Sequence, residues 1–295
     1  MASRGGLLTI SSDNNDKIID MVRKISVVFV CIFVVNVLLF SCKKESTTQG
    51  NDINTTQYTS NGLFSINDSI QVRFSPGNLQ YQASTNTWRF AEHQWDYIGE
   101  DNSNISDTYD GWIDLFGWGT GNNPTYHSTA LLDTVYNTFT DWGNNYISNW
   151  DGGDCRWYTL RYMDWHYLLY MRETESDVRY VAAIVNNIKG LILLPDDWDT
   201  SVYTFVNNGS TFDNNVVSAS LWETIERCGA IFMPAAGLRY GTNISWVQES
   251  GFYWIRGESS VGYVYYVQCW NGYTAISNHV SPHFGLSVRL VRDAE

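Results

Sequence analysis

The sequence predicts an α+β domain with few helices, many short antiparallel strands and long ordered loops. Three observations lead to this class. Short runs in which apolar and polar residues alternate are separated by turns rich in Gly and Asn, which is the pattern of antiparallel strands. Only two segments have the spacing of an amphipathic helix. Residues 96–157 are rich in Gly, Asn, Asp and Trp with weak periodicity, which indicates a long loop region held by buried tryptophans.

The predicted strands follow one another along the whole chain. They are residues 70–74, 79–81, 87–90, 180–185, 191–194, 230–233, 264–269 and 287–291. Asn186 and Asn187 lie between the fourth and fifth of these strands. Because Asn tolerates the left-handed backbone that tight turns require, this pair predicts a β-hairpin.

The first predicted helix covers residues 162–171. Trp165, Leu168 and Leu169 have the i, i+3, i+4 spacing that places them on one apolar face. This face should pack against the strands.

The second predicted helix covers residues 221–228. Ser220 precedes it and Glu223 follows three residues later, which is the pattern of an N-terminal capping box. Gly229 is placed to end the helix, since glycine readily adopts the left-handed conformation of a C-terminal cap.

The N-terminal part of the chain predicts export from the cytoplasm. Residues 25–40 are apolar and follow Arg23 and Lys24, but the run is shorter than the roughly 20 residues that a membrane span needs. A basic flank and a short apolar core are typical of a secretory signal. The layout fits best if translation starts at Met21.

Cys42 follows this apolar run and Ser41, and a polar stretch comes after it. The junction resembles the lipobox of bacterial lipoproteins, which implies that Cys42 carries the lipid (palmitate among its acyl chains) and becomes the mature N-terminus. We therefore expect a signal peptide over 1–41, a lipid-anchored polar tether over 42–61 and a single domain over 62–295.

The composition limits the partners of the mature domain. The formal net charge is −13, and an acidic chain repels a phosphate backbone, so nucleic acid is excluded as a partner. Membrane attachment is therefore expected to come from the lipid anchor. Cys155, Cys228 and Cys269 would remain after processing, and they allow either one disulfide or three buried thiols.

The usual signatures of catalysis are missing from the sequence. It contains no Gly-x-Ser-x-Gly elbow, no His-Glu-x-x-His and no phosphate-binding Gly-rich loop, so we expect no enzymatic activity and no cofactor. One group of oxygen-bearing side chains could suit calcium, although solvated loop residues are the simpler interpretation. Its members are Asp101, Asn102, Asn104, Asp107 and Asp110.

Five segments resemble motifs of a family of bacterial surface lipoproteins. They cover residues 157–165, 190–198, 228–242, 251–254 and 285–292, in the family's order. This family has a C-type-lectin-like fold of the formylglycine-generating-enzyme variety, and some members are similar to variable proteins of diversity-generating retroelements. The resemblance implies a rigid lectin-like scaffold with a ligand-binding, diversified surface at about residues 240–283. The cysteine pair of the formylglycine-generating enzyme is absent here, so that activity is not expected.

Alternation along the predicted strand 264–269 suggests which residues form this surface. Tyr265, Val267 and Cys269 share one face, which we assign to the core, so Tyr266 and Trp270 should face outward on the other. Large aromatics are favoured in binding surfaces because they offer rigid contact area at low entropic cost. The alternative is that these aromatics pack under a neighbouring loop. The candidate ligand-binding residues are Ile255, Arg256, Tyr263, Tyr266, Gln268, Trp270, Tyr273, Asn278, His279 and His283.

Together these observations predict a lipid-anchored binding protein at the outer membrane or cell surface of a Gram-negative bacterium. Its ligand would be a protein or a glycan. Two alternatives remain open at this point: a structural or fimbria-like component of the cell surface, and a glycan-active enzyme whose carboxylates converge in a cleft.

Overall fold

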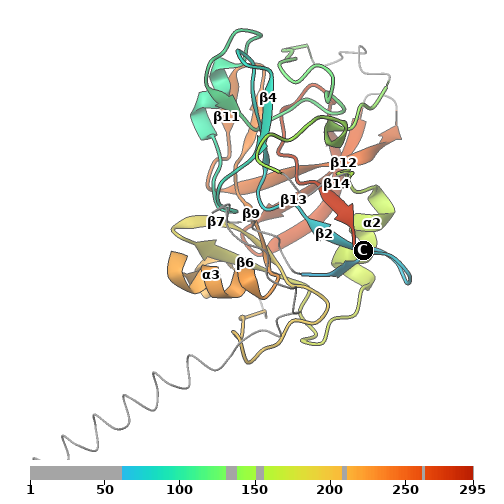
Figure 1. Cartoon of the computed structure of the whole chain (residues 1–295), viewed down its shortest axis with the longest axis vertical. Helices are drawn as coiled ribbons and strands as arrows, with labels where there is room; N and C mark the ends of the chain where they lie inside the picture. Colours follow the sequence, from blue (N-terminus) through green and yellow to red (C-terminus); the bar gives the residue numbers. More distant parts are fainter. Residues whose placement is uncertain (1–61, 131–137, 151–155, 208–210, 261–262, 295) are drawn as a thin grey trace, which may run out of the picture. The chain divides into compact units, whose positions relative to one another are not determined.

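The computed structural model describes residues 62–130, 138–150, 156–207, 211–260 and 263–294, with the side chains of 258–260 left out. All of these residues belong to one compact unit, Ile53–Glu295. This unit has the predicted α+β class, with short, mainly antiparallel strands in small sheets and few helices (Figure 1). The predicted signal peptide, Cys42 and the whole polar tether precede the described residues.

Within the described residues, no helix combines the length and the apolar character needed to cross a membrane.

Five small sheets make up the described β-structure. The first contains β1 (Phe64–Ser65), β2 (Gln71–Phe74) and β15 (Val291–Asp293), and the second contains β4 (Thr87–Phe90), β3 (Leu79–Gln82) and β5 (Trp112–Ile113). The third contains β8 (Val216–Val217), β6 (Tyr180–Val185), β7 (Ile188–Leu193) and β9 (Ile231–Pro234). The fourth contains β12 (Ser250–Ser260), β13 (Tyr263–Trp270) and β14 (Tyr273–Val280), and β10 (Leu238–Tyr240) pairs with β11 (Asn243–Ser245) in the fifth.

Most of the predicted strands are confirmed. β2, β3, β4, β6, β7, β9 and β13 lie within one to three residues of their predicted bounds. Asn186 and Asn187 both have a left-handed backbone, with φ of 49° and 65°, and they close the β6–β7 hairpin as predicted.

The prediction of a strand at residues 287–291 is wrong in its extent, because β15 begins only at Val291. The preceding residues form single bridges to three separate segments: Gly285 pairs with Arg239, Leu286 with Phe116, and Ser287 with Tyr253. A segment that changes partner at every residue has the sequence pattern of a strand but no continuous ladder.

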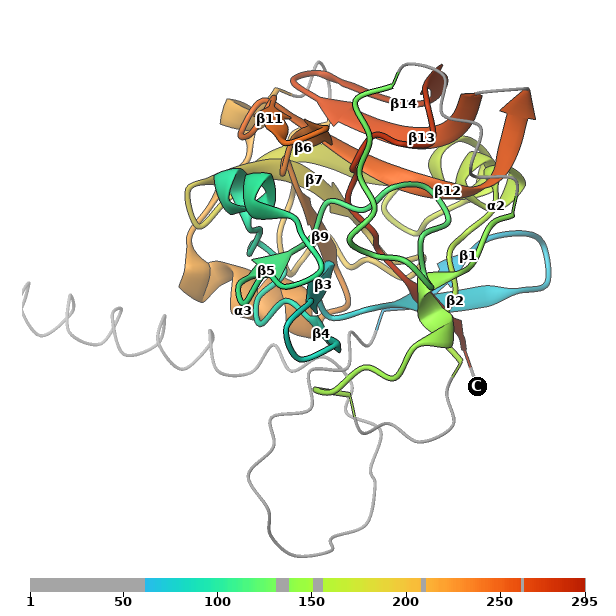
Figure 2. The ribbon, with the colours of Figure 1, turned by 90° about the horizontal axis from the view of Figure 1, so that it is seen from above.

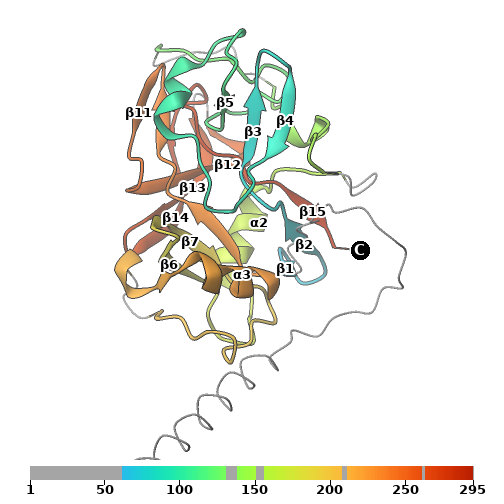
Figure 3. The same cartoon turned by 60° about the vertical axis from the view of Figure 1, so that its left-hand side comes forward.

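The two predicted helices are present with altered details. The first runs as α2 (Tyr162–His166) and continues as a π-helical turn, η3 (Tyr167–Met171). The second, α3 (Ala219–Arg227), begins two residues before the predicted start because Ser218, and not Ser220, accepts the capping hydrogen bond from the Leu221 amide at 3.3 Å. Its apolar face packs on β6, β7 and β9. Figure 3 shows α3 beside β6 and β7.

Gly229 ends α3 as predicted. Its φ of 95° is a left-handed conformation that is costly for any residue with a Cβ atom. The amide of Gly229 donates to the Glu226 carbonyl at 2.8 Å, and that of Ala230 donates to the Ile225 carbonyl at 3.3 Å. These are the two hydrogen bonds of a Schellman motif.

The long loop region is fastened to β12 by buried tryptophans, as the composition predicts. The indole of Trp118, from this loop, donates to the Ile255 carbonyl at 2.9 Å. In the opposite direction, Trp254 from β12 donates to the Phe116 carbonyl at 2.6 Å. The described part of the loop also contains η1 (Gly99–Asn104), β5 and η2 (Trp142–Asn144), in which Trp142 is fully buried.

The sheet β12–β13–β14 has a hydrophobic core on each side. Side chains from alternate positions, such as Phe252 and Trp254, join the core formed with the loop region. The intervening positions, such as Tyr253 and Val267, join a second core with α2, η3 and strands β1 and β2. Figure 2 shows the three strands side by side with α2 next to them.

The cysteines differ in state. Cys228 is disulfide-bonded, so the alternative of three free thiols is wrong. Cys269 is free and buried, and burial raises the pKa of its thiol to about 12. A thiol that stays protonated at neutral pH is a poor nucleophile, so Cys269 is a packing residue.

Candidate ligand-binding site

The hydrophobic cores on the two sides of β13 bury part of the predicted ligand-binding surface. Tyr266 is only 5% exposed and packs on Phe252, with ring centroids 6.0 Å apart. The prediction that Tyr266 faces solvent is therefore wrong, and the alternative that it packs beneath a loop applies to this residue. Strand alternation predicts the side on which a residue lies, but not whether that side is covered.

Two other predicted surface residues are also buried. Ile255 belongs to the core beside α2. His283 is fully buried, with its ring 5.7 Å from that of Tyr240 and 5.3 Å from that of Phe284. Neither side chain can contact an external ligand in this conformation. The prediction for both residues follows from their position in the C-terminal segment, and position in the chain carries no information about burial.

The remaining candidates are divided between the two ends of the sheet. Arg256, Tyr263 and His279 are exposed near the end where β13 begins. Trp270 and Tyr273 are exposed at the opposite end, where β13 turns into β14. Gln268 and Asn278 are partly buried between them. Because β13 contains eight residues at about 3.3 Å each, one small ligand cannot contact both ends.

The hairpin end carries the larger aromatic surface. Trp270 is 51% exposed and Tyr273 is 56% exposed, and their ring centroids lie 6.1 Å apart in an edge-on arrangement. They form the closing pair of the hairpin around Asn271 and Gly272. The Asn271 side chain accepts a hydrogen bond from the Phe212 amide at 2.9 Å, so the turn is tied to a neighbouring loop. The two rings are thus presented on a fixed support.

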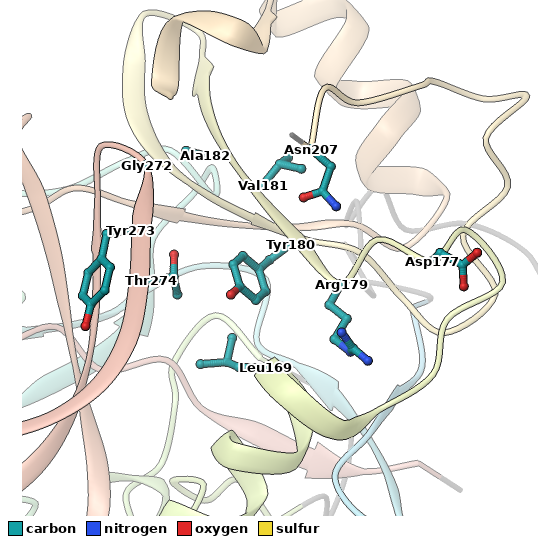
Figure 4. A pocket seen from close by; sticks show the side chains of 10 residues that line it. All are labelled: Leu169, Asp177, Arg179, Tyr180, Val181, Ala182, Asn207, Gly272, Tyr273 and Thr274. Atoms are coloured by element: carbon teal, nitrogen blue, oxygen red, sulfur yellow. The ribbon is translucent and has the colours of Figure 1, made fainter. Parts of the chain in front are cut away.

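A pocket of about 380 Å³ lies beside this hairpin (Figure 4). Gly272, Tyr273 and Thr274 form one wall, and the opposite wall comes from the start of β6. The other lining residues are Leu169, Asp177, Arg179, Tyr180, Val181, Ala182 and Asn207. Figure 4 shows Tyr180 reaching from β6 toward Thr274. The volume is within the usual range of small-ligand sites, and the lining combines aromatic rings with a few polar groups.

An ion pair between a buried arginine and a partly buried aspartate lies behind the charged rim of the pocket. Arg172 is buried and donates to Asp196 at 2.8 Å. Its guanidinium also donates to the Arg179 carbonyl at 3.1 Å, and Arg179 donates back to the Arg172 carbonyl. Asp196 in turn accepts from the Ser65 amide and hydroxyl at 2.9 and 2.7 Å. The start of β6 is thereby connected to β1.

Two tyrosines lie close to the free side of β14. Burial is the main cause that raises the pKa of Tyr180, and neighbouring Tyr170 adds to it, so Tyr180 stays a neutral hydroxyl at physiological pH. The hydroxyl of Tyr170 accepts a hydrogen bond from the Ile276 amide at 3.2 Å. Both hydroxyls can therefore act as donors and acceptors toward a bound molecule.

The sequence analysis missed the whole second wall of the pocket. Tyr180 was assigned only as a strand residue, and Arg179 and Asn207 had no role. These residues are far from the hairpin in the chain and meet it only through packing of the sheets. Asp177 has a left-handed backbone with φ of 58° and lies in a turn. An Asp in a turn is common, so its presence in the sequence does not point to a pocket.

Two of the five residues considered for calcium, Asn102 and Asp107, use side-chain oxygens in hydrogen bonds within the protein. The side-chain oxygen of Asn102 accepts from the amides of Asp114 and Leu115, and its nitrogen donates to the Asp114 carboxylate at 2.8 Å. Asp107 accepts from the Thr125 hydroxyl. Among the described residues, no three His, Cys, Asp or Glu side chains form a group that could hold a metal ion.

No protein-family model, no curated protein and no solved structure matches the chain. The argument for function therefore depends on the residues and geometry given above.

Proposed function

We propose that this protein is a non-enzymatic, lipid-anchored binding protein that works outside the cytoplasm, with its ligand site at the β13–β14 hairpin. The observation that carries the proposal is the exposure of Trp270 and Tyr273 directly beside the pocket. Two half-exposed aromatic rings side by side leave a joint apolar area in water, and a partner that covered this area would gain contact energy. The ligand is a protein or a glycan, recognised through these rings and through polar groups such as Arg179 and Asn207.

The pocket's composition supports binding over catalysis. Its ionisable side chains are Asp177, Arg179, Tyr180 and Tyr273, and Asp177 is its single carboxylate. Hydrolysis of glycosides usually needs two carboxyl groups placed across the bond that is cleaved. A glycan-active enzyme therefore receives no support from this pocket.

Two features support the proposed location. The resemblance of the segment around Cys42 to a lipobox supports acylation, export and a place at the outer membrane or cell surface. The disulfide at Cys228 fits the same compartment, because disulfides persist where the environment is oxidising. The resemblance to surface lipoproteins with a C-type-lectin-like fold supports a rigid scaffold that displays its C-terminal segment.

A binding screen tests the proposed site. Full-length protein in detergent is applied to an array of glycans and an array of secreted proteins, in parallel with a Trp270→Ala/Tyr273→Ala variant. We expect the wild-type signal to fall at least about tenfold in the variant, since interface aromatics often contribute 2 kcal/mol or more. Tyr146→Ala is the matched control, because Tyr146 is 80% exposed but lies outside the pocket lining.

Equal binding by the wild type and the double variant would refute the site. Assembly of the wild type into filaments, disturbed by the same substitutions, would instead identify a structural surface component. Lipidation has a separate test: labelled palmitate should enter the wild type and not a Cys42→Ser variant.

A further inference from the structure

We propose that the free edge of β14 binds an extended peptide segment of a partner protein as an added β-strand. This inference rests on the proposed function and specifies the ligand class of the same site. Its basis is the position of β14 in the sheet order β12–β13–β14, since no described strand pairs with its outer side.

The hairpin geometry decides which backbone groups of β14 point outward. Trp270 and Tyr273 flank a two-residue turn, so they form a hydrogen-bonded pair, and such pairs recur at every second residue of an antiparallel ladder. Ala275 and Ser277 therefore bond back to β13, whereas Thr274 and Ile276 direct their N–H and C=O groups away from the sheet. The bond from the Ile276 amide to the Tyr170 hydroxyl, at 3.2 Å, agrees with this alternation.

The two halves of this edge differ, and in the half next to the hairpin the Tyr170 hydroxyl occupies one outward amide, that of Ile276. A bulge between the pairs Val264–Val280 and Tyr266–Ser277 distorts the far half, and bulges of this kind discourage strand addition. The half next to the hairpin, residues 273–277, is regular and contains no Lys, no Pro and no charged residue, although natural edge strands commonly use these to prevent pairing.

The pocket lies on the line that an added strand would follow. Thr274 lines it from the β14 side, and β6 forms the opposite wall. A residue paired with Thr274 would project its side chain to the same face of the sheet as Thr274, the face on which Leu169 packs. The next residue of the peptide would project to the other face, where Tyr273 is exposed. Backbone bonds would thus supply affinity, and the pocket would select a bulky side chain.

A matched pair of substitutions isolates the outward hydrogen bond. Thr274→Pro removes the outward N–H and leaves the bonds to β13 intact, since proline is tolerated on the free side of an edge strand. Thr274→Val keeps the N–H and nearly the same shape. The probe is a phage-displayed library of random nonapeptides, selected on the full-length protein in detergent. Thermal unfolding of each variant verifies that the fold is retained.

We expect enriched peptides whose affinity falls about tenfold or more with Thr274→Pro and stays within about twofold with Thr274→Val. Tyr170→Phe should tighten binding by roughly threefold to tenfold, because the peptide carbonyl then no longer competes with the Tyr170 hydroxyl for the Ile276 amide. In the bound state, the Thr274 and Ile276 amides should exchange more slowly with solvent.

Three results would overturn the inference. The first is that the full-length protein enriches no peptide beyond the background selected on the Thr274→Pro variant, and the second is that the enriched peptides bind both Thr274 variants equally. The third is that the protein associates with itself and Thr274→Pro abolishes this association, which would make a second copy the occupant. Glycan binding lost in the Trp270→Ala/Tyr273→Ala variant but kept in Thr274→Pro would also overturn it while leaving the proposed function standing. If the double aromatic variant retained all binding, the proposed function itself would fail.

Discussion

The loop region and the β13–β14 hairpin use aromatic side chains in opposite ways. In the loop region, Trp118 and Trp142 are buried, and Trp118 makes a hydrogen bond to the backbone of β12. At the hairpin, Trp270 and Tyr273 each keep about half of their surface in water. The first group replaces regular secondary structure as the means of ordering a long segment. The second group leaves about half of its surface uncovered, and under the proposed function a partner covers it.

This difference shows that the aromatic content of the chain is not in itself a sign of binding. Tyr266 lies on the same face of β13 as Trp270 and is nevertheless buried, because it belongs to the core that this sheet forms with the loop region, where its ring packs on Phe252 of β12. Four residues along one strand separate a buried aromatic, Tyr266, from an exposed one, Trp270. The cover that the loop provides, and not the residue type, makes the distinction.

The largest effect should come from the loop side of the comparison. Trp254→Ala removes a buried indole and leaves the Phe116 carbonyl without its 2.6 Å partner. We expect the free energy of unfolding to fall by about 5 kcal/mol, measured by urea denaturation. Trp254→Phe, which keeps a ring but loses the N–H, should cost clearly less. A loss below about 1 kcal/mol for the alanine variant would mean that the tryptophans do not order the loop.

The sequence predicts this half of the molecule well in outline. Low periodicity together with many tryptophans indicated an ordered loop, and Trp118 and Trp142 are indeed buried. The short segments η1 and β5 inside the loop were not predicted, because each is stabilised by distant partners. β5, for instance, pairs with β3 through Tyr81 and Ile113.

The next effect concerns the base of the pocket. Arg172→Met removes the ionic partner of Asp196, which is 19% exposed and keeps its hydrogen bonds from Ser65 and Gln71, so the cost should lie below the roughly 3 to 5 kcal/mol of a fully buried pair. We expect a loss of about 2 kcal/mol in unfolding free energy and weaker binding at the hairpin site, because the Arg179 carbonyl loses its donor, the Arg172 guanidinium. Arg156→Met, at an exposed arginine, is the control and should change stability by less than about 0.5 kcal/mol. Equal stability of the two variants would contradict this role of Arg172.

A smaller, pH-dependent effect belongs to the loop region. Burial raises the pKa of Asp114 from 3.8 to about 6, although bonds from Asn102 and the Ile98 amide oppose the rise. The folded protein therefore binds a proton more tightly than the unfolded chain, and this contribution to stability is full below about pH 4 and is lost as pH rises to about 6. Its size is about 3 kcal/mol.

Asp114→Asn should remove this dependence between pH 4 and 6. Urea denaturation at several pH values, for the wild type and the variant, measures the difference. Parallel pH profiles for the two proteins would show that Asp114 does not titrate in this range.

The sequence predicts the hairpin side less completely. Trp270 and Tyr273 were identified from alternation and from the family resemblance, and both are exposed. The opposite wall of the pocket, with Tyr180 and Arg179, was not identified. That wall reaches the hairpin only because the sheet β8–β6–β7–β9 packs against the sheet β12–β13–β14. No local pattern of residues encodes this packing. β14 was also missed, because a half-exposed edge strand with Ser, Asn and His lacks a clear apolar alternation.

The most direct test of the central claim needs no ligand. It is the free energy of unfolding of the Trp270→Ala/Tyr273→Ala variant, measured by urea denaturation against the wild type. If these rings are reserved for a partner, removing both should change stability by less than about 1 kcal/mol. A loss of about 3 kcal/mol or more, similar to a core truncation, would show that the hairpin aromatics hold the fold together and would contradict the account.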